Sequence, residues 1–201
     1  MLLDCIRADT RQLRDDVAPL LKSDTLRILL GLVQLADMAM LHWSRINAHI
    51  RAVSLPIRRQ QIALDTLCAK VERRLALVDI ALRVTLPSYP IFLAGDPQLL
   101  EDALCLALLS LDSYWDLNRA ISLIADIEDG SVMLQCVTVC PYRIQFDDPI
   151  WPGSFISTAE LIIRLHGGEL RAVAQDEQTA IVSTICLPQA RAGQMPSAAG
   201  V

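Results

Sequence analysis

Hydrophobic residues recur at helical spacing through the first quarter of the chain. A weaker stripe covers residues 2–21, where Pro19 disfavours further helix, and a stronger stripe covers residues 24–50. The second stripe is apolar around more than one face, so its helix must bury more surface than one short partner helix could cover. We expect the segment to form a homodimer through a helical bundle. Packing against the chain's own C-terminal domain would bury the same surface.

Farther along, the pattern predicts helices and strands in turn. Helical spacing over residues 56–75 begins at a proline, which suits the first position of a helix. The period changes to two over residues 80–86, which predicts a strand, and a short apolar segment follows at 91–93. Asp96 is a good N-cap for a helix over residues 97–114, whose first residue is also a proline.

The C-terminal third predicts two pairs of strands separated by a helix. Alternating runs at residues 121–127 and 131–139 flank the sequence Glu-Asp-Gly, which is a hairpin signal. A helix over residues 154–165 ends near a Gly-Gly pair, and strands follow at 169–174 and 180–187. Helices segregated beside a mixed sheet predict an α+β sandwich.

These elements predict a helical segment, one α+β domain and a tail. The helical segment covers residues 1–55, the domain covers residues 56–188, and the small, polar tail at 189–201 is expected to be disordered. A chain of 201 residues accommodates one such domain but not two large ones.

Composition and charge exclude several classes of function. Hydrophobic residues make up 53% of the chain and charged residues 20%, which is the composition of a folded protein. The net charge is -5 and the basic residues are dispersed, so we expect no nucleic-acid partner. The start of the chain lacks the apolar core of a signal peptide, and no apolar run approaches the roughly 20 residues that span a bilayer. We therefore expect a soluble, cytoplasmic protein without membrane contact.

Six cysteines are scattered along the chain without the paired spacing of a zinc site. Most lie inside apolar runs, so we expect reduced thiols in the core and no bound metal. They are Cys5, Cys68, Cys105, Cys136, Cys140 and Cys186.

Four strings occur in the order found in bacterial sensor histidine kinases. They are SRINA at residues 44–48, GDPQLLEDALCLALLSL at 95–111, AELIIRLHGGEL at 159–170 and TAIVSTICLP at 179–188. The first resembles the end of the dimerisation hairpin, the second the segment with the asparagine box, and the last two the end of the ATP-binding domain. Over residues 40–188 the chain therefore resembles this family, which implies a dimerisation hairpin followed by the histidine-kinase ATPase fold.

The departures from the family pattern fall at the nucleotide site that the resemblance implies. Leu106 and Ser110 stand where the asparagine box would coordinate magnesium, and leucine cannot ligate a hard cation. No DxGxG aspartate follows Val139, and the glycine-rich segment retains Gly153 but has Phe155 where backbone would approach phosphate. The short connection from Val139 to Gly153 implies a shortened lid. We expect a degenerate site that holds neither ATP nor another cofactor.

The phosphoacceptor histidine of the family is also missing. Arg14 stands at its position, and a guanidinium stays protonated and cannot accept a phosphoryl group. His166 belongs to the HGG string and is expected to cap a helix end. The remaining candidates are His42 and His49, which lie seven residues apart on one face of the predicted second helix.

Three interpretations remain open. The first is a non-catalytic, histidine-kinase-like adaptor, a homodimer that binds a response-regulator receiver domain or a histidine kinase. In the family, receiver domains dock near the junction of hairpin and domain, which implies partner contacts at Leu41, His42, Arg45 and His49. The alternative is a phosphorelay histidine phosphotransferase that uses a histidine of the second helix. A globular domain with an accidental likeness to the family is a third interpretation.

Overall fold

The computed structural model describes residue 39 and residues 42–77, 80–112, 120–139, 153–175 and 180–190. The chain divides into two compact units, Met1–Asn47 and Ala48–Val201, which we treat separately. A helix spans residues 42–54, so the predicted second helix ends four residues later than expected. The following predictions fall on residues outside the described ones: the helix at 2–21, most of the stripe at 24–50, Arg14, Leu41, the shortened lid and most of the tail.

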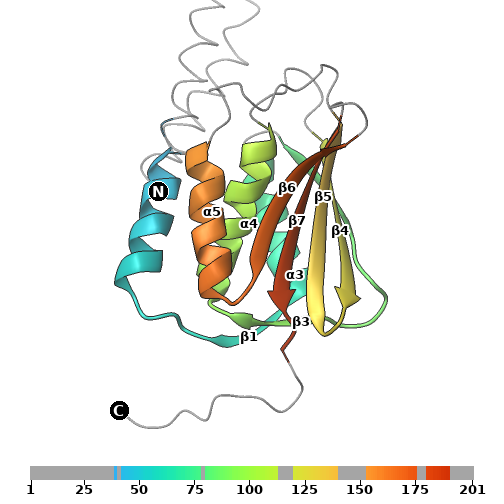
Figure 1. The fold of residues 1–201 in the computed structure, drawn as a ribbon, viewed down its shortest axis with the longest axis horizontal. Helices are drawn as coiled ribbons and strands as arrows, with labels where there is room; N and C mark the ends of the chain where they lie inside the picture. Colours follow the sequence, from blue (N-terminus) through green and yellow to red (C-terminus); the bar gives the residue numbers. More distant parts are fainter. Residues whose placement is uncertain are drawn as a thin grey trace, which may run out of the picture. The chain divides into compact units, whose positions relative to one another are not determined.

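The second unit contains a five-stranded sheet in the order β2-β4-β5-β7-β6. Strands β2 and β4 are parallel, and the other neighbours are antiparallel. Helices α3, α4 and α5 lie together on one side of this sheet, with α4 in contact with both of the others (Figure 1). This confirms the predicted α+β sandwich. The bounds are α3 Leu64–Ala76, β2 Ala81–Thr85, α4 Pro97–Asp112, β4 Ala120–Glu128, β5 Ser131–Val139, α5 Gly153–Leu165, β6 Glu169–Gln175 and β7 Ala180–Pro188.

The helix predicted over residues 56–75 is wrong in its first part, where the structure has a strand of a second, two-stranded sheet. Strand β1 (Gln60–Ala63) pairs antiparallel with β3 (Phe92–Gly95), and α3 begins only at Leu64. Nothing in the local sequence opposes helix at residues 60–63. Pairing with a distant strand overrides that propensity, because it buries Ile62 and satisfies the backbone of both strands.

Two local signals in the sequence act as predicted. The Asp96 carboxylate accepts hydrogen bonds from the backbone N–H groups of Gln98 (3.0 Å) and Leu99 (3.2 Å), which caps α4. The hairpin between β4 and β5 turns at Asp129 and Gly130, whose φ angles are 49° and 75°. Positive φ at both central residues is the requirement of a tight hairpin turn, and Asp-Gly meets it.

The core lies between the sheet and the three helices, and α4 is its centre. Nearly every residue of α4 from Leu99 to Leu108 is buried, which explains why its apolar pattern is not confined to one face. Cys68, Cys105 and Cys136 are free thiols packed in this core, and burial raises the pKa of each to about 12. They remain protonated at neutral pH and act as small hydrophobic side chains.

Candidate functional site

The GDP and HGG strings, 70 positions apart, meet at the buried imidazole of His166. Its Nε2 accepts a hydrogen bond from the backbone N–H of Asp96 (3.0 Å), and its Nδ1 lies 2.7 Å from the carbonyl oxygen of Ile162. A backbone N–H can only donate and a carbonyl can only accept, so the ring is neutral with its proton on Nδ1. Burial lowers the pKa of His166, although the Ile162 carbonyl and Asp96 act in the opposite direction. The bond to Ile162 is the helix-end role that the sequence predicted.

Glycines around His166 are required by close packing. A Cβ on Gly95 would lie 2.5 Å from Cδ2 of His166, and a Cβ on Gly168 would lie 2.3 Å from the carbonyl oxygen of Cys186. Gly167 has φ of 78°, a conformation that favours glycine. Packing at the join of β3, α4, α5 and β6 therefore accounts for both strings without any contribution from nucleotide chemistry.

The two asparagine-box positions lie on one face of α4, four residues apart. The Leu106 side chain is 2% exposed and offers only hydrocarbon. The Ser110 side chain is fully buried, and its hydroxyl donates a hydrogen bond of 2.6 Å to the carbonyl of Ala107 in its own helix. Neither position presents an oxygen ligand at the surface.

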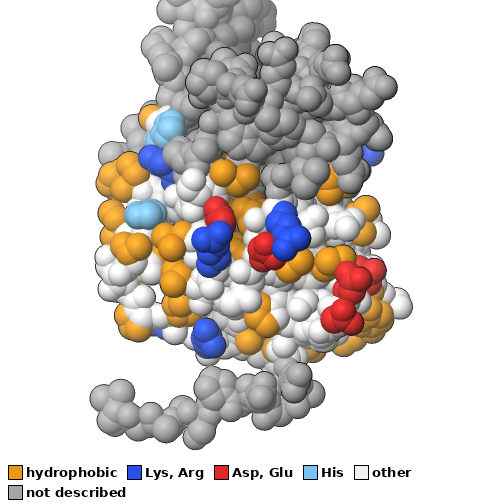
Figure 2. All heavy atoms as spheres, viewed as in Figure 1, with side chains coloured by type: hydrophobic (Ala, Val, Ile, Leu, Met, Phe, Trp, Pro, Cys, Tyr) orange, Lys and Arg blue, Asp and Glu red, His pale blue; other side chains and the backbone are white. Residues whose placement is uncertain are grey.

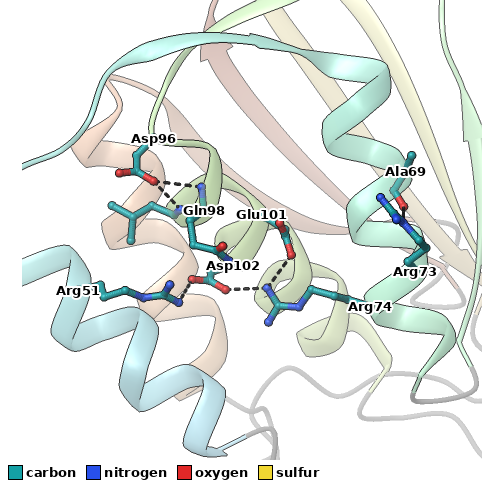
Figure 3. Close-up of polar contacts among 9 residues, drawn as sticks. Arg51, Ala69, Arg73, Arg74, Asp96, Gln98, Glu101 and Asp102 are labelled. Atoms are coloured by element: carbon teal, nitrogen blue, oxygen red, sulfur yellow. Dashed lines mark hydrogen bonds and ion pairs between the residues drawn. The ribbon is translucent and has the colours of Figure 1, made fainter. Parts of the chain in front are cut away.

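A charged cluster that sequence reasoning missed lies one turn before Leu106. The Asp102 carboxylate, whose residue is 1% exposed, accepts hydrogen bonds from Arg51 Nη2 and from Arg74 Nη1, the latter at 2.7 Å. Arg74 also lies 3.2 Å from Glu101 Oε1 (Figure 3). Separately from this buried cluster, Figure 2 shows acidic and basic side chains lying side by side on the surface of one face. The adjacent acids Glu101 and Asp102 in a largely apolar helix were the available signal, because a buried carboxylate needs cationic or hydrogen-bonding partners.

The predicted partner-binding residues lie along the helix at residues 42–54. His42 and His49 are exposed and Arg45 is half-buried, whereas Leu41 lies outside the described residues. The same helix carries large exposed hydrophobic side chains at spacings of three, four and three residues. These are Trp43, Ile46, Ile50 and Val53, of which Trp43 is 56% exposed.

The remaining parts of the predicted nucleotide site are only partly described. Gly153 and Phe155 lie in the first turn of α5, which packs against α4. Within the described ranges, no three His, Cys, Asp or Glu side chains gather as a metal site would require. Nor does any helix there have the length and apolarity needed to cross a membrane.

Comparison with known proteins shows which solved structures share this architecture. No family model matches the sequence, and no curated protein is significantly similar to it. Among solved structures, the chain is similar to the Acinetobacter baumannii histidine kinase AdeS (TM-score 0.59, 15% identity), covering 93% of this chain and 95% of that one. The mycobacterial sensor histidine kinase MprB gives a TM-score of 0.52 at 17% identity, over 66% of this chain and 98% of MprB.

A third structure, full-length ShkA in complex with AMPPNP, gives a TM-score of 0.61 at 13% identity. The match covers 95% of this chain and 46% of ShkA. At these identities the likeness establishes the fold, which is that of the histidine kinases. The resemblance to histidine kinases expected from the sequence is thus confirmed at the level of the fold.

Proposed function

We propose that this chain is a non-catalytic adaptor of two-component signalling, which binds the receiver domain of a response regulator or a histidine kinase. The observation that carries the proposal is the buried state of Leu106 and Ser110 on α4. Magnesium requires oxygen ligands, and a hydrocarbon side chain together with a hydroxyl engaged by its own helix supplies no such pair. Docking a protein partner requires surface complementarity and no phosphate site.

The exposed helix supports the docking part of the proposal. Cationic and imidazole groups at Arg45 and His49 lie on the same helix as exposed apolar side chains, including Trp43. Aromatic and arginine side chains are common anchors of protein interfaces. We propose that this helix serves both a receiver or kinase partner and a second copy of the chain.

The first test is direct titration with a fluorescent ATP analogue and magnesium, with ShkA as the positive control. We expect no saturable signal from this chain at micromolar concentrations. Saturable binding that unlabelled ATP competes away would contradict the proposal. Thermal unfolding with and without ATP and magnesium is an independent readout, because a ligand that binds only the folded state raises the unfolding temperature.

One observation favours the phosphotransferase as a second candidate: the side chains of His42 and His49 are both exposed. A relay histidine must present an imidazole nitrogen in line with the phosphoryl group of the receiver aspartate. Such a transfer first requires that the imidazole be accessible to the receiver, and the exposure of these rings meets that requirement. The adaptor needs neither ring as a nucleophile.

Incubation with a phosphorylated, radiolabelled receiver domain separates the two candidates. For an adaptor we expect no label on this chain, and partner affinity within about twofold for the His42→Ala, His49→Ala double variant. Acid-labile label that disappears in the His42→Ala or the His49→Ala variant would establish the phosphotransferase instead. His166→Gln is the matched control, because that ring is buried and cannot take part in transfer.

A further inference from the structure

A cavity of about 350 Å³ lies between the start of α3 and the connection from β2 to β3. None of the residues used in the proposed function lines it. Its walls come from residues 63–65 and 86–92. The volume is at the lower end of the roughly 300–1,000 Å³ that is typical of small-molecule sites, so the cavity suits a small ligand.

Two apolar residues at the floor of this cavity, Leu64 and Ile91, are held in place. Leu64 and Ile91 are buried, and the backbone N–H of Leu64 donates a 3.0 Å hydrogen bond to the carbonyl of Ile91 across the two segments. Pro87 and Pro90 fix φ on either side of Tyr89, which limits the freedom of the wall. A cavity of this kind is formed before a ligand arrives, so little conformational entropy is lost on binding.

The rim of the cavity carries one acid and one aromatic ring. The Asp65 carboxylate is exposed, and its Oδ1 accepts hydrogen bonds from the backbone N–H (2.5 Å) and hydroxyl (3.2 Å) of Thr66. No Lys or Arg among the described residues forms an ion pair with Asp65. Tyr89, which is 50% exposed, lines the same cavity. A carboxylate without an ion-pair partner and an exposed aromatic ring both attract a cation.

We propose that this cavity binds a small organic cation, an amine or guanidine whose apolar body occupies the floor while its charged end meets Asp65 and Tyr89. Apolar side chains of the lining, such as Leu64 and Ile91, account for the body of such a ligand, and Asp65 and Tyr89 account for its head. The same chemistry is offered by a free amine or guanidine and by the side chain of Lys or Arg in a peptide.

Backbone amide NMR of the full chain tests this site with defined probes. Tyramine is titrated beside 4-ethylphenol, which has the same ring and lacks the amine. We expect saturable shifts confined to residues 63–65 and 86–92 for tyramine, with a millimolar dissociation constant, and no saturable shift for 4-ethylphenol. Agmatine and N-acetyl-arginine amide distinguish the sources: binding of both indicates that a peptide side chain is accepted, and binding of agmatine alone indicates a free ligand.

Asp65→Asn tests the role of the charge, since the amide retains an oxygen that can accept the hydrogen bonds from Thr66. We expect the affinity for tyramine to fall about five- to tenfold. Glu128→Gln removes another exposed carboxylate, away from the cavity, and should leave the affinity unchanged. Equal binding of tyramine and 4-ethylphenol, shifts spread over other parts of the chain, or undiminished binding in Asp65→Asn would overturn the assignment. These outcomes are independent of ATP and receiver binding.

Discussion

At the scale of single residues, His166 shows how one side chain can link two distant segments. The Nε2 atom of its neutral ring accepts a hydrogen bond from the backbone N–H of Asp96, and its Nδ1–H donates to the carbonyl of Ile162. Protonation of Nε2 would point its N–H at the N–H of Asp96, so that hydrogen bond would be lost. The folded state therefore favours the neutral form, in agreement with the lowered pKa.

The stability of the second unit should consequently depend on pH through His166. Because the folded pKa is below the ordinary histidine value of 6.5, the stabilisation is present above pH 6.5 and is lost as pH falls through the folded pKa. We expect the free energy of unfolding in urea to decrease between pH 7 and pH 5. The decrease should be smaller in His166→Gln, whose amide oxygen can still accept from Asp96. A His49→Gln control should retain the slope of the parent, and an equal slope in His166→Gln would contradict this explanation.

At the scale of elements, the Asp102 cluster joins three helices. Arg51 comes from the C-terminal part of the helix at residues 42–54, Arg74 from α3 and Asp102 from α4. The three side chains come from separate elements, and the two arginines lie 51 and 28 positions from Asp102. The carboxylate is buried, whereas the arginines are each about one third exposed. Loss of the acid therefore leaves two cations that can still reach water, which moderates the cost.

We expect Asp102→Ala to lower the free energy of unfolding by about 2–3 kcal/mol, below the full effect of breaking a fully buried pair. Arg51→Met retains an aliphatic stem and removes one partner, so its effect should be about 1 kcal/mol. Glu160→Gln is a suitable control, because it removes a surface pair with Arg164 whose contribution is within about 0.5 kcal/mol. Urea unfolding of the three variants tests whether the loss of unfolding free energy decreases from Asp102→Ala through Arg51→Met to Glu160→Gln. Equal stability of Asp102→Ala and the parent would show that the cluster contributes nothing net.

Sequence reasoning found the elements whose signals are local. The Asp96 cap, the Asp-Gly turn and the Gly-Gly helix end each depend on neighbouring residues, and the structure confirms the elements that they bound. Strand β1 was missed because its partner lies some 30 positions away and residues 60–63 carry no pattern of their own. The partners of Asp102 are likewise distant, at 51 and 28 positions, so its acidic signal in α4 did not identify them. Burial of Leu106 and Ser110 could not be read from the sequence, since residue type does not fix which surface is covered.

At the scale of the whole molecule, the exposed apolar series on helix 42–54 bears on assembly. Single exposed hydrophobic residues are ordinary, but Trp43, Ile46, Ile50 and Val53 recur at the spacing of a helix interface. We expect the chain to be a homodimer in solution.

Ile46→Lys together with Ile50→Lys should convert this dimer into a folded monomer. Both side chains are already exposed within one chain, so the substitutions need not disturb its core. Ile124→Lys is the matched control, because Ile124 on β4 is exposed to a similar extent but lies on the sheet. Sedimentation velocity across a wide concentration range measures the result. A monomeric parent chain would contradict the assignment of this helix to an interface.

The mixed direction of the sheet has a kinetic consequence. Strands β4 and β5 are joined by a two-residue turn and can pair within about 1–10 μs, whereas β2 pairs parallel with β4 only after α4 has crossed between them. Closing that longer loop costs more chain entropy, so β2 is expected to join after the rate-limiting barrier.

Leu82→Ala in β2 should then speed unfolding with little change in the folding rate, and Leu134→Ala in β5 should slow folding itself. During unfolding, β2 would accordingly separate from β4 before the β4–β5 hairpin opens.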